Sequence, residues 1–268
     1  MLKLNYQRKV GVQTLKLGAQ FYGLREKNKT PEGLRESFKA MKEIGYEVAQ
    51  MSAICKIEPE RLMSFSEEFS LPIVCTHSPI DRIVNDTEAL IKEHKIYGCG
   101  VIGLGSLPIE YHGSIEAVRK AIEMLRDPVK RITDAGMQFS YHNHAFDFDD
   151  IGGTCILDLL VDELPDIGVI LDTYWVEYAG QDLTAYIEKL GAKRLVNVHY
   201  KDMESAPKGR ICSCGAGVLD FVKITDVCER VGVRNVLVEQ DNAPSFGDEY
   251  EQMRLSFNHL RPIIAKEN

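Results

Sequence analysis

Residues 167–172 read Ile-Gly-Val-Ile-Leu-Asp, a short apolar run that ends in a carboxylate. Residues 236–239, Val-Leu-Val-Glu, repeat that pattern. Apolar residues on both faces of a strand are typical of a parallel sheet that is covered by helices. A carboxylate that directly follows such a strand is costly to bury without a partner. These two stretches therefore predict buried parallel strands with a polar site at their ends.

Around these stretches, short β-branched runs alternate with longer amphipathic segments. We expect eight strands, at residues 10–15, 46–51, 71–77, 101–104, 137–142, 167–172, 195–199 and 236–239. We expect helices at about residues 31–44, 59–69, 86–97, 114–134, 154–163, 183–190, 221–230 and 247–265. Strands that alternate with helices predict a parallel sheet. Eight such units in about 250 residues match the size of a closed barrel.

An open, doubly wound sheet is the main alternative. Such a sheet would normally carry a G-x-G-x-x-G phosphate-binding turn after its first strand. Residues 18–21, Gly-Ala-Gln-Phe, follow the expected first strand and lack that spacing. We therefore predict an α/β fold, a single (β/α)₈ TIM barrel that spans residues 1–268.

Composition narrows the class of function. The formal net charge of −8 argues against nucleic acid and against anionic membranes, which need a basic surface. No run of 18 apolar residues or signal peptide is evident, so we expect a cytoplasmic protein. The seven cysteines are expected to be reduced, and the Cys212–Cys214 pair is interpreted as two loop thiols. A homo-oligomer is compatible with the sequence.

Most of the expected strands end in a side chain that can bind a metal or move a proton. His142, Asp172, His199 and Glu239 follow one another at intervals of 30, 27 and 40 residues, about one strand–helix unit each. In a parallel barrel they would meet at the C-terminal face. Any one of them could be an ordinary hydrogen-bonding residue, but four in succession favour a metal site. Two imidazoles and two carboxylates suit Mn²⁺, Zn²⁺, Co²⁺ or Fe²⁺ better than Ca²⁺.

The chain resembles a known family, the xylose isomerase-like sugar phosphate isomerases and epimerases. The resemblance rests on residues 141–148 (Tyr-His-Asn-His-Ala-Phe-Asp-Phe), 171–176, 198–203 and 238–241, with 11–14 and 215–220 beside them. It implies a TIM barrel with one divalent metal ion, often Mn²⁺, with Mg²⁺ as another candidate. It implies Asp172, His199 and Glu239 as ligands. His142 and Asp147 stand where many relatives carry Glu.

The resemblance also implies proton abstraction next to a carbonyl, with an enediolate stabilised by the metal. Glu239 and His144 are the expected acid/base residues, and a histidine with a near-neutral pKa suits that role. His144 could instead orient a ligand. The expected substrate-binding residues are His77, Lys201, Trp175, Gln13 and Arg210. For His77, Lys201 and Trp175 the alternatives are a strand-end hydrogen bond, a salt bridge to Asp202 or Glu204, and simple packing.

The leading hypothesis is a metal-dependent isomerase or epimerase that acts on a keto-sugar or ketocyclitol. The alternative is a lyase of the same fold, inosose dehydratase-like or able to cleave 3-keto C-glycosides. A DNA-repair barrel of the endonuclease IV kind would need a three-zinc cluster and a basic surface, which seven histidines and a charge of −8 do not suggest. A non-catalytic sugar-binding protein would not need four metal donors.

Overall fold

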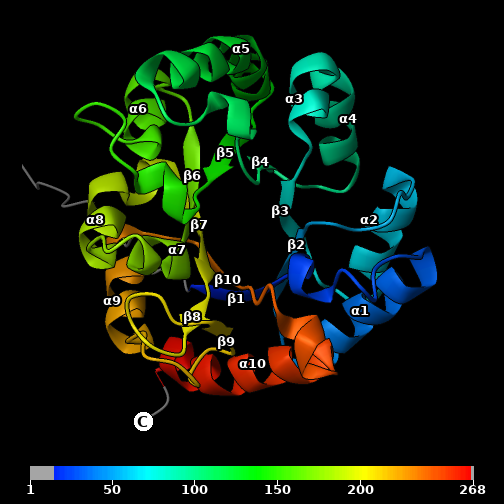
Figure 1. Cartoon of the computed structure of the whole chain (residues 1–268). Coiled ribbons are helices and arrows are strands. Elements are labelled where there is room, and N and C mark those ends of the chain that lie inside the picture. Colours follow the sequence, from blue (N-terminus) through cyan, green and yellow to red (C-terminus); the bar gives the residue numbers. More distant parts are fainter. Residues whose placement is uncertain (1–14, 267–268) are drawn as a thin grey trace, which may run out of the picture.

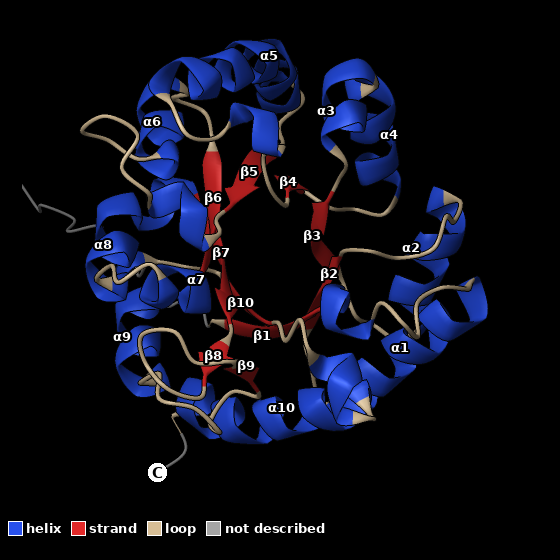
Figure 2. Ribbon diagram, in the orientation of Figure 1, coloured by secondary structure: helices blue, strands red, loops and turns tan. Residues whose placement is uncertain are grey.

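The computed structural model describes residues 15–266, in which eight parallel strands close into a barrel that helices surround (Figures 1 and 2). The strands follow one another around the barrel in the order β1-β10-β7-β6-β5-β4-β3-β2. Their bounds are β1 Lys16–Gln20, β2 Val48–Met51, β3 Ile73–His77, β4 Val101–Leu104, β5 Gln138–His142, β6 Gly168–Asp172, β7 Leu195–Tyr200 and β10 Asn235–Val238. The predicted TIM barrel is confirmed.

The helices form the outer ring in Figure 2. They are α1 Pro31–Ile44, α2 Pro59–Glu68, α3 Ile80–Asn85, α4 Thr87–Ile96, α5 Ile115–Asp134, α6 Ile156–Glu163, α7 Thr173–Tyr178, α8 Leu183–Arg194, α9 Phe221–Val231 and α10 Glu249–Ala265. Each of the eight predicted helices has a counterpart, whereas the short helices α3 and α7 were not predicted. Among residues 15–266, no helix is both long enough and apolar enough to cross a membrane.

The position of the first strand differs from the sequence-based prediction. Residues 10–14 lie outside the described residues, Leu15 is not in a strand, and β1 is Lys16–Gln20. A Cβ atom at Gly18 would lie 2.4 Å from Cδ2 of Leu237 and 2.6 Å from Cγ2 of Val48. Because the two neighbouring strands leave no room there, β1 lacks the bulky residues that make a strand recognisable.

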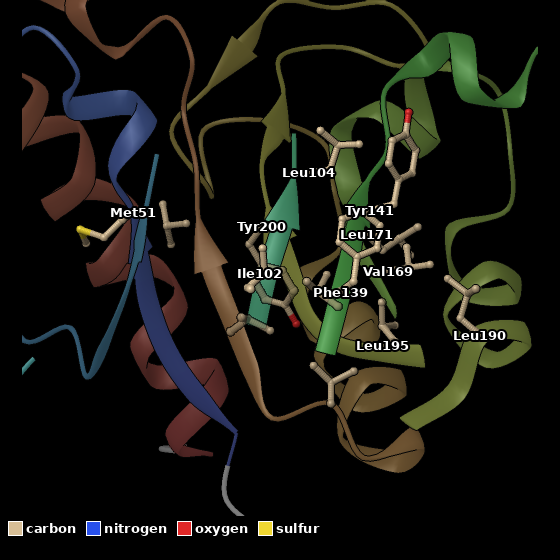
Figure 3. Packing of buried hydrophobic residues seen from close by; sticks show 14 of the residues in the cluster. Met51, Ile102, Leu104, Phe139, Tyr141, Val169, Leu171, Leu190, Leu195 and Tyr200 are labelled. Carbon is tan, nitrogen blue, oxygen red and sulfur yellow. The ribbon is translucent and has the colours of Figure 1, made fainter. Parts of the chain in front are cut away.

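The strands are buried almost throughout, as their apolar sequences suggested. Every residue of β2, β4, β6 and β10 is buried. Figure 3 shows Ile102, Phe139 and Leu171 among the side chains of the apolar cluster that the strands share with the helices. A rigid packed core of this kind fixes the strand ends in place, so that side chains just beyond them are held in defined positions.

The loop after β7 contains a small antiparallel pair, β8 Asp202–Met203 and β9 Ile211–Cys212. The carboxylate of Asp202 organises this loop, because it accepts hydrogen bonds from the backbone N–H groups of Met203, Gly215, Gly217 and Leu219 at 2.8–3.1 Å. The carboxylate of Asp202 is therefore hydrogen-bonded to backbone N–H groups, and it does not form an ion pair with Lys201. Cys212 and Cys214 are free and buried in the same region.

Candidate metal centre and active site

Four strand ends bring His142, Asp172, His199 and Glu239 together at the C-terminal mouth of the barrel. One possible ligand atom from each residue lies within 4.8 Å of the others, and all four residues are buried. Nδ1 of His199 lies 2.8 Å from Oε2 of Glu239. Nε2 of His142 lies 3.3 Å from Oδ2 of Asp172. The four predicted ligand residues thus form one cluster that could hold a metal ion.

Each histidine uses its outer nitrogen for a hydrogen bond. Nδ1 of His142 lies 3.1 Å from the backbone carbonyl oxygen of Gly105. Nε2 of His199 lies 2.9 Å from Oε1 of Gln50. Because both partners are acceptors, these outer nitrogens carry the proton in the neutral rings. The inner nitrogens then present lone pairs to the cluster, which is the arrangement found in metal-binding histidines.

Each carboxylate is held in the same way by its outer oxygen. Nε2 of Gln20 donates to Oε1 of Glu239 at 2.8 Å. The backbone N–H of Trp175 donates to Oδ1 of Asp172 at 3.1 Å, because Asp172 caps the start of α7. The inner oxygens, Oε2 of Glu239 and Oδ2 of Asp172, remain directed at the two histidines.

Two inner atoms are left without a hydrogen bond. Nδ1 of His199 and Oε2 of Glu239 lie 2.8 Å apart without forming a hydrogen bond, and the nearest cation to Oε2 is the ammonium of Lys201 at 3.1 Å, so Nδ1 has no partner at all. Burying unpaired polar atoms is costly. A divalent cation would accept lone pairs from both, and a mixed set of two nitrogens and two oxygens suits Mn²⁺, Fe²⁺, Co²⁺ or Zn²⁺. The residues present therefore fit such an ion.

Lys201 brings a positive charge to the cluster. Its Nζ lies 2.8 Å from Oδ2 of Asp172, 3.1 Å from Oε2 of Glu239 and 3.0 Å from Oδ1 of Asp241. Burial lowers the pKa of Lys201, but the three carboxylates outweigh it and raise the pKa well above its usual range. Burial raises the pKa values of Asp172 and Glu239, and Lys201 with the neighbouring histidines more than reverses this, so both carboxyls are ionised.

The histidines around the pocket differ in protonation. Burial lowers the pKa of His144 to about 3 and that of His77 well below its usual range. Burial also lowers the pKa of His142, but Asp172 and Glu239 outweigh burial and raise it. His144 is therefore a neutral imidazole at pH 7, and the near-neutral pKa that we expected for it is not found. Its ring stacks on Phe146 and lies 5.4 Å from Trp175.

A pocket of about 380 Å³ opens above the cluster. It brings together His77, His142, His144, Lys201 and Glu239, all named in the sequence analysis, and it is also lined by Tyr22, Ser52, Ser78, Leu104 and Asp241, among others. Trp175, another predicted substrate-binding residue, does not line this pocket; its ring lies 5.6 Å from Nζ of Lys201.

Of the predicted substrate-binding residues within residues 15–266, Arg210 also lies outside this pocket. Arg210 follows the cis peptide-containing loop between β8 and β9, is 79% exposed, and pairs with Glu204. Gln13 lies outside the described residues.

Sequence reasoning missed several residues of the site. Gln20 and Gln50 are neutral amides near the ends of β1 and β2, and nothing in their type indicated a role. Asp241 stands two residues after Glu239, and its proximity to that strand end could have revealed it. Burial raises the pKa of Asp241 to about 6 despite its ion pair with Lys201.

Asp147 holds His144 in position in this site. Its carboxyl accepts a hydrogen bond from the hydroxyl of Tyr141 at 2.7 Å and another from the backbone N–H of His144 at 2.6 Å. It thereby fixes the turn that carries His144 into the pocket. Burial raises the pKa of Asp147 to about 7.

Comparison with known proteins agrees with this architecture. Residues 38–263 match the family described as "Xylose isomerase-like TIM barrel", and the chain belongs to that family. Comparison with proteins of curated function gives no significant match.

Solved structures extend the likeness to most of the chain. A sugar phosphate isomerase/epimerase from Parabacteroides distasonis ATCC 8503 is similar with a TM-score of 0.79 at 18% identity, over 93% of this chain and 95% of that one. A D-allulose 3-epimerase from Methylomonas sp. gives 0.69 at 14% identity, over 94% and 98%. The probable 3-DHS dehydratase from Bacillus anthracis gives 0.70 at 12% identity, over 92% and 99%. At these identities the likeness concerns the fold.

Proposed function

We propose that the protein is a metal-dependent isomerase or epimerase that acts on a keto-sugar or ketocyclitol. The observation that carries this proposal is the buried cluster of two histidines and two carboxylates at the floor of an open pocket. His142, Asp172, His199 and Glu239 would hold one divalent ion, with Mn²⁺ first and Zn²⁺, Co²⁺, Mg²⁺ or Fe²⁺ as other candidates. Family membership and the sugar isomerases among the structural neighbours support the same class.

The ion would supply positive charge beside the carbonyl and hydroxyl oxygens of the sugar and so favour loss of the neighbouring carbon-bound proton. Glu239 is proposed as the base, because it is ionised and lines the pocket. The Lys201 ammonium stabilises negative charge that develops on the substrate. His144, a neutral imidazole that lines the pocket, is proposed as the second catalytic group, which donates a hydrogen bond to a substrate oxygen as negative charge develops on it.

His77, which lines the pocket, and Trp175, which lies next to it in the site, are proposed to recognise the substrate. His77 has a buried Nε2 without a partner, and a sugar hydroxyl would satisfy it. Trp175, close to both His144 and Lys201, would pack against the apolar C–H face of a sugar ring. The substrate is inferred to be a small molecule rather than nucleic acid, because the net charge is −8. A cytoplasmic location remains part of the proposal.

The test is an exchange assay in D₂O. The purified protein, loaded with Mn²⁺, is incubated with a panel of 2-keto and 3-keto sugars, and deuterium uptake is followed by NMR. We expect exchange at the carbon next to the carbonyl and conversion to an epimer or isomer, both abolished in Glu239→Gln. Loss of a leaving group would identify the lyase instead. If no sugar exchanges and the protein binds no metal, the proposal is wrong.

A further inference from the structure

A second, larger groove lies beside the active-site pocket. Its volume is about 710 Å³, and its walls come from the end of β2, the loop that leads to α2, the end of β3, and α2, α3 and α4. Figure 1 shows these helices on the same side of the barrel mouth. Ser52, His77, Ser78 and Pro79 line both the groove and the active-site pocket. The two spaces are therefore adjoining parts of one surface.

Three of the four residues at the junction, Ser52, His77 and Ser78, are polar, and His77 lies close to the cluster. Oγ of Ser52 lies 3.4 Å from Nδ1 of His77, and the ring of His77 lies 5.1 Å from that of His142 and 5.7 Å from that of His199. A molecule that reaches from the pocket into the groove would pass these groups. An ether or glycosidic oxygen at the junction would find a hydrogen-bond partner there.

The groove itself is mainly apolar and has no net charge to satisfy. Its walls include Ile54, Ile57, Leu62, Leu90 and Tyr97. Arg82, at the edge of the groove, forms two hydrogen bonds of 2.9 Å with Glu93, so neither of these charges is free to bind a ligand. On the exposed rim, Lys56 and Glu58 carry opposite charges. Such a groove suits a neutral, ring-shaped apolar group better than a phosphate or a second sugar.

The loop that forms one wall also has an unusual backbone. Ala53 has φ +52, a left-handed conformation that a residue with a Cβ rarely adopts. The other two such residues in the described chain, Ser70 and Lys266, follow the ends of helices, where this conformation is common. Ala53 instead follows a strand and lines the groove. Strain of this kind persists where a site requires it.

We propose that the groove binds the aglycone of a glycoside, an apolar ring attached to the sugar that lies in the active-site pocket. This inference rests on the proposed function and deepens it, because it names the substrate class as a glycoside of a keto-sugar rather than a free monosaccharide. The hydroxyl of Ser52, next to Nδ1 of His77, donates a hydrogen bond to the linking oxygen, and Ile54, Ile57 and Leu62 contact the ring.

The test compares matched methyl and phenyl β-glycosides of a 3-keto sugar, with dissociation constants measured calorimetrically on the Mn²⁺-loaded protein. We expect the phenyl glycoside to bind about tenfold more tightly. Ile57→Trp, which fills the groove, should remove that advantage and leave the affinities for the methyl glycoside and for Mn²⁺ unchanged. Val222→Trp, on the exposed face of α9, is the control and should preserve the advantage.

A chemical readout locates the bound ring independently. Cys55 lines the groove and is half-buried, whereas the other six cysteines, all within the described residues, are buried. The phenyl glycoside should slow maleimide labelling of Cys55 and the methyl glycoside should not, with Cys55→Ser showing the background.

The outcomes separate the two proposals. Equal affinities for the two glycosides in the wild type, or an advantage that survives Ile57→Trp, overturn the groove proposal while metal and sugar binding stand. If Mn²⁺ does not bind and neither glycoside does, the groove proposal and the proposed function fail together.

Discussion

The two halves of the barrel mouth differ in what they contribute. The adjoining strands β5, β6, β7 and β10 end in His142, Asp172, His199 and Glu239, which carry the charge and the donor atoms. The opposite half, β4 to β1, contributes neutral acceptors and donors, namely Gly105, Gln50 and Gln20, that bind the outer atoms of three of those residues, the exception being Asp172. One half determines which atoms meet at the centre. The other half determines which way three of the four side chains face.

The largest effect is expected in the charged half. Asp172→Asn keeps the oxygen that caps α7 but removes the negative charge that faces both histidines. The affinity for Mn²⁺, measured calorimetrically, should fall by more than the 10–100-fold that is typical of losing an outer partner. The matched control is Asp182→Asn at the exposed cap of α8, which should not change it. An unchanged affinity in Asp172→Asn would remove Asp172 from the site.

A smaller effect is expected in the neutral half. Gln50→Leu removes the acceptor that fixes His199, and the affinity for Mn²⁺ should fall about 10–100-fold. Gln50→Glu keeps an acceptor oxygen and should restore most of the affinity. If Gln50→Leu binds Mn²⁺ as the wild type does, the orientation of His199 does not depend on β2, and the contrast between the two halves fails.

Asp147 lies in the charged half without being one of the four clustered residues. Its pKa of about 7 in the folded state exceeds the value of about 3.9 expected in the unfolded chain, so the folded state holds its proton more tightly. The resulting stabilisation is complete below the unfolded pKa and is lost as pH rises through the folded pKa. Between these two pKa values, the titration of Asp147 should lower the free energy of unfolding by about 1.4 kcal/mol for each unit by which the pH rises.

Urea unfolding of the metal-free protein at pH 5, 6, 7 and 8 measures this slope. Asp147→Asn cannot ionise, so its stability relative to the wild type should improve from pH 5 to pH 7 and then level off. Tyr141→Phe serves as the control, because it removes a hydrogen bond to Asp147 and leaves the carboxyl able to titrate. If the free energy of unfolding depends on pH in the same way in the wild type and in Asp147→Asn, the pKa of Asp147 is not raised by burial.

The smallest effect is expected at Arg210. Its guanidinium is exposed and pairs with Glu204 outside the pocket, and exposed ion pairs contribute about 0–1 kcal/mol. Arg210→Ala should leave exchange activity on an unphosphorylated keto-sugar unchanged, as measured by deuterium uptake. A clear loss of activity would bring Arg210 back among the substrate-binding residues.

Much of the fold was predictable because it depends on patterns along the chain. Pro31–Ile44 and Val101–Leu104 were predicted with their observed bounds, since proline, capping residues and apolar runs mark them. β1 was misplaced because contact with Leu237 and Val48 requires Gly18 there, and only the closed barrel creates that contact. Helices α3 and α7 are six residues each, too short for a clear periodicity.

The candidate site was predictable to the extent that charge and residue type identify it. Four donors one strand apart could be read from the sequence, and they meet in the structure. Gln20 and Gln50 could not be found, because a glutamine acts here only through the atom it faces across the barrel. Asp202 and Asp147 also follow strand ends, but their carboxylates accept hydrogen bonds from backbone N–H and tyrosine hydroxyl groups rather than joining the cluster.

The presence of a metal ion at the barrel mouth can be measured by metal analysis of the protein. Apoprotein is titrated with Mn²⁺, and metal bound after desalting is measured by mass spectrometry for the wild type, Glu239→Gln and His199→Gln. We expect one ion per chain in the wild type and nearly complete loss in both variants, with folding retained as judged by circular dichroism. A wild type that holds no ion, or variants that hold it as tightly as the wild type, would contradict a metal centre at the barrel mouth.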